Sequence, residues 1–78
     1  MSATGDAELG HKLRKRRLEG DHGLKQPAHF AGIKPSTLSD YEKGRSTPGV
    51  VVLKKLADFY GVRVDWLLSH LSRRDTAA

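Results

Sequence analysis

The chain has 78 residues, which is room for one small domain. It contains no cysteine, so a disulfide scaffold, a thiolate metal site and a cysteine nucleophile are excluded. The formal net charge is +5, which is typical of proteins that bind an acidic partner such as nucleic acid, although a solvated helix face gives the same signal. The longest aliphatic run, residues 50–53, is far too short to span a membrane, and residues 1–10 lack the pattern of a secretion signal. We therefore expect a cytoplasmic protein.

Two helices are predicted in the first 31 residues. The first begins after Asp6, which can cap it, and ends near residues 19–20, where a turn cluster starts. Leu9 and Leu13 lie four residues apart and form its apolar face. The second helix covers about residues 24–31 and is short, because Pro27 is tolerated only in a first turn.

Three further helices are predicted over residues 35–43, 50–60 and 64–72. Pro35 suits the first position of the earliest of these, and Gly44 suits the left-handed position after its end. No segment alternates as a strand would, so the fold class is all-α. We expect a flexible arm over residues 1–6, one domain over residues 7–72 and a flexible tail over residues 73–78.

Five short helices with a small-residue turn between the second and third are typical of a helix-turn-helix domain. The most specific segment reads Ala28-x-x-x-Gly32-Ile33-x-x-Ser36-Thr37-Leu38-Ser39-x-Tyr41-Glu42-x-Gly44-Arg45-x-x-Pro48. With this segment, residues 9–68 resemble the lambda-repressor/Cro (XRE) family of bacterial and phage transcription regulators. The resemblance implies a compact five-helix, lambda-repressor-like DNA-binding domain.

The resemblance also implies particular contacts inside the domain. In this family the glutamate matching Glu42 often pairs with the arginine matching Arg14, so we expect an Arg14–Glu42 ion pair that ties the third helix to the first. We expect Ala28 and Gly32 to be small because the second and third helices cross closely there. The chain departs from the family between residues 18 and 27, which leaves open which residue makes the usual phosphate contact at the start of the second helix.

The third predicted helix is the candidate DNA reader, because a helix fits the major groove of B-DNA. Asp40 is its most specific residue. A carboxylate is repelled by phosphates unless it accepts a hydrogen bond from an exocyclic amine, most naturally N4 of cytosine. The alternative is that Asp40 only faces solvent or Lys43. The base-reading positions carried over from the family are Pro35, Ser36, Thr37, Ser39 and Asp40.

Other residues are expected to position the domain on DNA or to join two copies of it. Family members usually bind palindromic operators as dimers, since one small module buries little surface. Trp66 would anchor the dimer, or would instead cover the core of its own chain. The predicted phosphate contacts are Lys25, Gln26, Lys34, Lys43, Arg45, Ser46 and Thr47. The predicted dimer surface consists of Trp66, Leu67, His70 and Leu71.

The sequence thus predicts a sequence-specific regulator that binds double-stranded DNA as a homodimer, most simply a repressor in a bacterial cytoplasm or encoded by a phage. An enzyme is not expected, because no spacing brings a nucleophile and a base together and no glycine-rich phosphate cradle is present. The four histidines show no metal-ligand spacing, and no cofactor is expected. The alternative is a protein-interaction module, such as an antitoxin that binds a partner protein and regulates its own gene.

Overall fold

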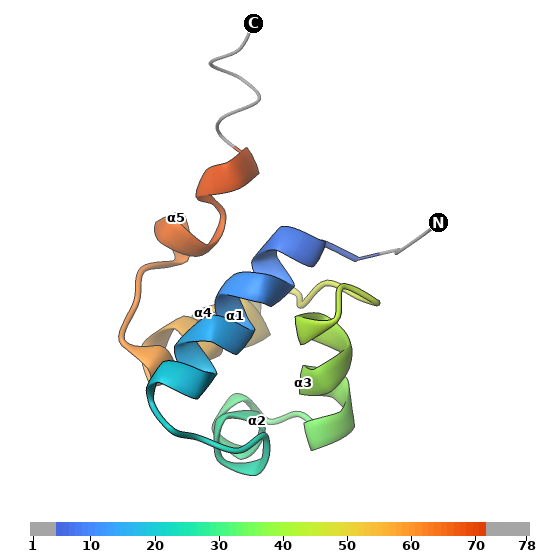
Figure 1. Ribbon diagram of the computed structural model, residues 1–78, viewed down its shortest axis with the longest axis vertical. Coiled ribbons are helices and arrows are strands. Elements are labelled where there is room, and N and C mark those ends of the chain that lie inside the picture. Colours follow the sequence, from blue (N-terminus) through green and yellow to red (C-terminus); the bar gives the residue numbers. More distant parts are fainter. Residues whose placement is uncertain (1–4, 72–78) are drawn as a thin grey trace, which may run out of the picture.

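The structure is a computed structural model that describes residues 5–71. Its helices follow one another in the order expected from the sequence, and Figure 1 shows their arrangement. No strand occurs in this range, and none of its helices has the length and apolar content needed to cross a membrane. The predicted arm and tail lie outside the described residues, except for Gly5 and Asp6. The helices are α1 (Ala7–Glu19), α2 (Lys25–Ala31), α3 (Pro35–Glu42), α4 (Val50–Tyr60) and α5 (Val64–Leu67).

The helix starts follow the local signals in the sequence. Asp6 caps α1, because its Oδ1 accepts a hydrogen bond of 3.0 Å from the backbone N–H of Leu9. Pro27 lies in the first turn of α2, and Pro35 is the first residue of α3. Each proline therefore occupies a position where its missing N–H removes no helical hydrogen bond.

The helix ends differ from the prediction at two places. Helix α3 ends at Glu42, with Lys43 as its C-cap. Helix α5 ends at Leu67 instead of continuing to residue 72, because the backbone turns at Leu68 before residues 69–71 become helical again. The prediction of one continuous last helix is therefore wrong, and the residues after Leu68 face in other directions than a single helix would give them.

The hydrophobic core lies where the helices meet. Helix α1 packs mainly on α3, and α2 packs mainly on α4. The small residues Ala28 and Ala31 of α2 are buried in the core. The fully buried leucines come from four helices, so each of those helices contributes at least one side chain to the same core. These are Leu9, Leu13, Leu38, Leu56 and Leu67.

Gly10 and Gly32 are required for different structural reasons. A Cβ at Gly10 would collide with the backbone carbonyl oxygens of Tyr41 and Glu42, so α1 and α3 touch backbone to backbone there. Gly32 has a φ of 75°, and nothing lies within 4 Å of a Cβ built on it. The prediction that a close helix crossing demands a small residue at Gly32 is therefore wrong, since its left-handed backbone is the reason for glycine.

Arg17, not Arg14, forms the ion pair with Glu42. Arg17 Nε donates to Glu42 Oε2 at 2.7 Å, and Nη2 donates to Oε1 at 2.9 Å. A third donor of the same guanidinium, Nη1, reaches the backbone carbonyl oxygen of His22 at 3.0 Å. The Glu42 side chain is only 4% exposed and that of Arg17 12%, whereas Arg14 is exposed to solvent. The predicted Arg14–Glu42 pair is thus wrong in its arginine.

The position of each arginine around α1 explains the difference. At about 100° per residue, Arg17 lies between Leu13 and Gly10, inside the buried arc of the helix. Arg14 lies beyond Gly10, on the outer side of that arc. Helical side chains also lean toward the N-terminus of their helix, so Glu42 leans back along α3 toward the later part of α1, as the chain directions in Figure 1 show.

The pKa values of two groups at this contact are raised. The hydrogen bond to Glu42 raises the pKa of Arg17, although burial opposes this in part. Burial, and then the charge of Glu42, raises the pKa of the neighbouring Tyr60 hydroxyl far above its usual value. Both groups therefore keep their protons over the whole physiological range.

We expect Arg17→Ala to lower the free energy of unfolding by about 3–5 kcal/mol, because it leaves a buried carboxylate without its partner. Arg14→Ala is the matched control, and a change within about 0.5 kcal/mol is expected for an exposed side chain. Urea unfolding followed by circular dichroism measures both. Equal losses for the two variants would contradict the assignment of the pair to Arg17.

Candidate nucleic-acid interface

The outward side of α3 carries the residues predicted to read bases. Taking about 100° per residue, Ser36, Asp40 and Lys43 lie opposite Leu38, which is fully buried. Ser36 and Lys43 are exposed, and Asp40 is half-buried. All five predicted base-reading residues retain some solvent access: Pro35, Ser36, Thr37, Ser39 and Asp40. Most of their side chains are short, so the backbone of α3 can approach a surface closely.

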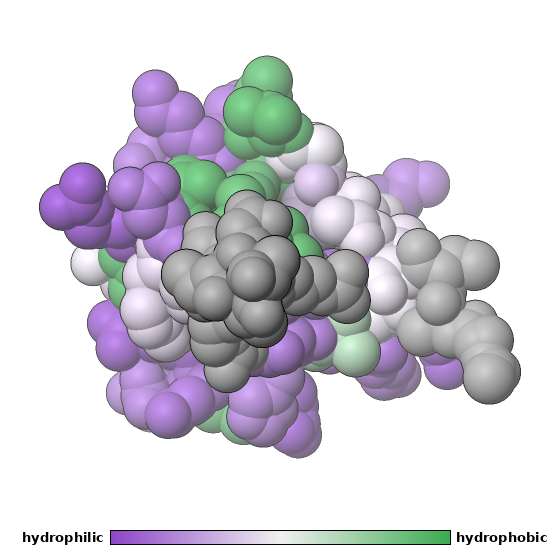
Figure 2. Space-filling view, turned by 90° about the horizontal axis from the view of Figure 1, so that it is seen from above, coloured by the Kyte–Doolittle hydropathy of each residue, from purple (hydrophilic) through white to green (hydrophobic). Residues whose placement is uncertain are grey.

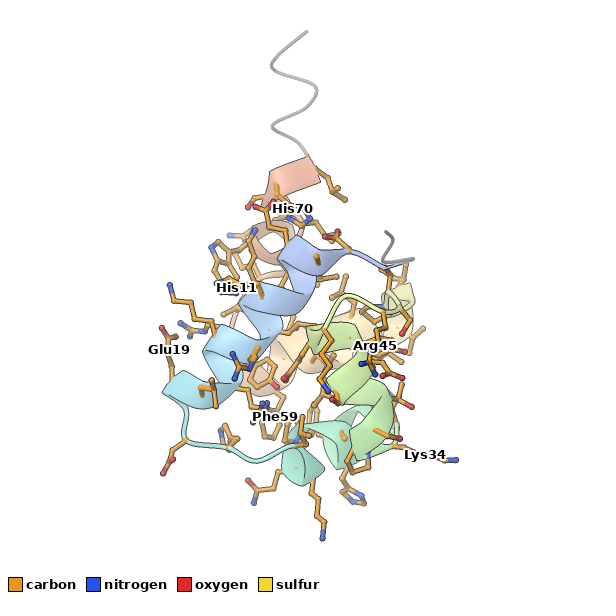
Figure 3. All side chains as sticks on the ribbon, turned by 45° about the vertical axis from the view of Figure 1, so that its right-hand side comes forward. His11, Glu19, Lys34, Arg45, Phe59 and His70 are labelled. Atoms are coloured by element: carbon orange, nitrogen blue, oxygen red, sulfur yellow. The ribbon has the colours of Figure 1, made fainter. Side chains whose placement is uncertain are left out.

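Cations lie at both ends of α3. Lys34 immediately precedes the helix, and Arg45 follows it. Figure 3 shows the two at opposite ends of α3, with Lys34 directed away from the body of the protein. The start of α2 adds further polar groups. Five of the residues predicted to contact phosphates have long, exposed side chains, namely Lys25, Gln26, Lys34, Lys43 and Arg45. Of the two remaining residues, Ser46 is half-buried and Thr47 is exposed.

Asp40 lies beside Arg45. Their Oδ1 and Nη1 atoms are 3.5 Å apart, and the side chains are 45% and 68% exposed. An ion pair this exposed contributes little to stability. Its effect is to place a cation next to the carboxylate, while the carboxylate keeps the capacity to accept further hydrogen bonds. The Asp40 carboxylate thus lies beside Arg45 and remains partly open to solvent.

Asp6 joins the loop after α3 to both ends of the described chain. Its backbone N–H donates to Thr47 Oγ1 at 2.9 Å, and the N–H of the preceding Gly5 donates to the carbonyl oxygen of Gly44 at 3.0 Å. Its Oδ2 accepts a hydrogen bond of 2.7 Å from Nε2 of His70, while Oδ1 caps α1. One carboxylate therefore holds together the start of α1 and the helical residues 69–71, while its backbone holds the loop.

The pKa of Asp6 lies below its ordinary value. Burial by itself raises this pKa, but the hydrogen bond from the Leu9 N–H and the contact with His70 outweigh burial. Asp6 is therefore ionised at neutral pH, as its capping of α1 requires.

Two of the four residues predicted to form the dimer surface are exposed, and the other two are buried. Trp66 and Leu71 are 40% and 44% exposed, so they are available at the surface. Leu67 is fully buried in the core, and His70 is 8% exposed against Asp6. The fold therefore leaves Leu67 and His70 unavailable for the predicted surface, because Leu67 fills the core and His70 is held against Asp6. Figure 2, seen from the α5 end, shows hydrophobic atoms at the surface among hydrophilic ones.

Trp66 also interacts with α1 of its own chain. Lys12 Nζ lies 5.2 Å from the centroid of the indole ring, a cation–π distance. The same ammonium donates to the carbonyl oxygen of Trp66 at 2.8 Å and to Ser69 Oγ at 2.9 Å. One face of the ring therefore lies against Lys12, and Trp66 as a whole remains 40% exposed.

Three further features were not predicted from the sequence. They are the Arg17–Glu42 pair, the contact between Asp6 and His70, and an exposed aromatic cluster around Phe30 and Phe59. The first two join residues far apart in the chain, so no local spacing signals them. Across residues 5–71, no three His, Asp or Glu side chains lie close enough to hold a metal ion.

Comparison with known proteins identifies the arrangement. The sequence profile of the helix-turn-helix family matches residues 13–67. The transcriptional repressor RstR of the cryptic phage CTXphi, from Vibrio cholerae, is 38% identical over 58 residues, which is 74% of this chain and 52% of RstR. The chain spans about half the length of the curated relatives it matches.

Solved structures agree with the sequence match. The N-terminal DNA-binding domain of SinR from Bacillus subtilis superposes with a TM-score of 0.74 at 28% identity, over 81% of this chain and 93% of that domain. SinR in complex with DNA superposes with a TM-score of 0.70 at 30% identity, over 77% of this chain and 97% of that one.

We expect Asp6→Ala to lower the free energy of unfolding at pH 7 by about 2–4 kcal/mol, because it removes a helix cap and leaves the buried His70 ring without its acceptor. Asp58→Ala, at an exposed position on α4, is the control. Because the pKa of Asp6 is lowered by folding, its contribution is complete above 3.8 and is lost as the pH falls through its folded pKa. Thermal melts from pH 5 to pH 2 check this. A stability gap that stays constant over that range would contradict it.

Proposed function

The chain belongs to the helix-turn-helix family of the lambda-repressor/Cro (XRE) type, and we propose that it is a transcriptional regulator that binds double-stranded DNA by inserting α3 into the major groove. The observation that carries this proposal is the division of α3 into two sides. Its inner side is held by Leu38 and by the Glu42 ion pair, and its outer side presents short polar side chains between cations.

The dimensions support insertion of α3. A helix with its side chains is about 10–12 Å across, and the major groove is about 12 Å wide. Short side chains such as Ser36 and Ser39 allow the helix to lie deep in the groove, while Lys34 and Arg45 meet the phosphates on either side. The complex of SinR with DNA supports this arrangement, because this chain has the same fold.

Within this proposal, Asp40 reads a base. Its carboxylate accepts a hydrogen bond from an exocyclic amine, and Arg45 reduces its repulsion from the nearby phosphates. Two copies of the chain bind a palindromic operator, with Trp66 and Leu71 in the contact between them. The naming of RstR as a repressor supports repression as the sign of regulation, and the site of action is then the bacterial cytoplasm.

The proposal is tested by selecting duplexes that the protein binds from a random DNA pool at about 0.1 M salt. We expect the selected duplexes to share a palindromic consensus. Asp40→Ala should relax the preference at one base pair of each half-site by a factor of about 5–150, equivalent to about 1–3 kcal/mol. Asp58→Ala, on α4, should leave the consensus unchanged. If the protein binds none of the duplexes in the pool, even in dilute salt, the proposed function is wrong.

Lys34→Ala should weaken binding to all sequences equally and reduce the slope of log affinity against log salt by about one. Lys15→Ala is the control, since Lys15 lies about 140° around α1 from Gly10, which contacts α3. Fluorescence anisotropy with a selected duplex and a scrambled one at several salt concentrations gives the slopes. A changed base preference with an unchanged slope would rule out a phosphate contact for Lys34.

A further inference from the structure

An aromatic groove lies between α2 and the end of α4, outside the outward side of α3. It is open to solvent, has a volume of about 630 Å³, and is lined by His22, Lys25, Gln26, His29, Phe30 and Phe59. Figure 3 shows Phe59 beside α2. The ring centroid of Phe59 is 5.0 Å from that of His22 and 5.5 Å from that of Phe30, so three aromatic rings form a continuous wall.

The groove exposes aromatic side chains to solvent. Phe30 is 51% exposed, although the Phe59 ring lies beside it. Large aromatic side chains that stay at the surface in a group, with polar residues around them, are a common mark of an interaction site. The core does not require Phe30, because the neighbouring Ala28 and Ala31 already bury the inner side of α2.

The charge of the lining restricts what can occupy the groove. Lys25 is a cation that forms no ion pair within residues 5–71, and none of the six lining residues is acidic. The Gln26 side-chain amide nitrogen and the imidazole of His29 can donate hydrogen bonds at the rim, while His22 Nδ1 lies 3.3 Å from Gln26 Oε1. The best complement is therefore an acidic group next to an apolar anchor.

Other occupants fit this chemistry less well. Residues 72–78 carry two arginines and one aspartate, and a second copy of the chain has a net charge of +5, so neither complements Lys25. A DNA backbone offers phosphates but no apolar side chain to cover Phe30. We propose that the groove binds an acidic segment of a partner protein, in which one aromatic or long aliphatic side chain packs between Phe30 and Phe59 and its carboxylates face Lys25.

The test is a selection of random twelve-residue displayed peptides on the immobilised full chain. We expect the enriched peptides to carry an excess of Asp and Glu around one aromatic or long aliphatic residue. Phe30→Ala should weaken a selected peptide at least about tenfold, the loss typical of an aromatic hot spot. Leu18→Ala is the matched control, since Leu18 is 52% exposed outside the groove. No enrichment, enrichment of basic or neutral peptides, or equal binding to the Phe30→Ala variant would overturn the proposal.

A charge reversal gives a second, independent readout. Lys25→Glu should weaken the selected acidic peptide by about tenfold or more, whereas Lys15→Glu on α1 should not. Circular dichroism melts of each variant establish that it is folded before binding is measured. Unchanged binding of the peptide to the Lys25→Glu variant would show that the carboxylates of the peptide do not face Lys25, and would overturn the proposal.

One consequence rests on the proposed function. Lys25 and Gln26 are also proposed phosphate contacts, so the peptide and a duplex should compete for the chain. Adding the selected peptide to a complex with labelled duplex should release the DNA. Simultaneous binding of both would overturn the shared use of Lys25. A chain that binds the peptide and ignores every duplex would refute the proposed function and leave the peptide site intact.

Discussion

The buried ion pair between Arg17 and Glu42 is the contact on which the placement of α3 depends. Removing two charges from water costs several kcal/mol for each ion, and this cost is offset only when the geometry is close to ideal. Here the pair is bidentate, and a third donor of the guanidinium is also satisfied. Helix α3 has eight residues, too few to be stable alone, and only Leu38 and Glu42 of these are buried. Leu38, the partly buried Tyr41, the close backbone contact with Gly10 and the ion pair thus hold the inner side of α3, and its outer side remains accessible to solvent.

The same arginine organises the chain between α1 and α2. Its Nη1 holds the carbonyl oxygen of His22, just after Asp21 adopts a left-handed backbone with φ of 59°. His22 then packs its ring on Phe59 and forms one wall of the aromatic groove. The proposed DNA surface and the proposed peptide surface therefore share this support, and they also share Lys25 and Gln26 at the start of α2. Loss of Arg17 would disturb both, whereas changes at Asp40 or Phe30 would each disturb one.

Helix positions were largely predictable, because caps, prolines and glycines act locally. Asp6, Pro35 and Gly44 each mark a boundary within one residue of where the structure has it. The arginine that pairs with Glu42 was not, because four basic residues follow Leu13 in succession and only the contact made by Gly10 shows which of them faces α3. The turn at Leu68 has no glycine or proline to signal it, so periodicity did not show where the last helix breaks or that His70 is buried against Asp6. The groove depends on which rings remain uncovered, a property of packing between α2 and α4.

Asp6 explains how the ends of the described chain contribute to the DNA surface. A threonine hydroxyl has one hydrogen to donate and two lone pairs. Because Thr47 Oγ1 accepts from the backbone of Asp6, its own hydrogen can serve the phosphate contact proposed for Thr47. The carboxylate of Asp6 at the same time holds His70, and with it the helical residues that carry Leu71. In the proposed dimer, the contact between copies is then rigidly connected to the loop beside α3. The separation of two α3 helices, which must match one turn of DNA, is in that case determined by side chains close to Asp6 rather than by α3 itself.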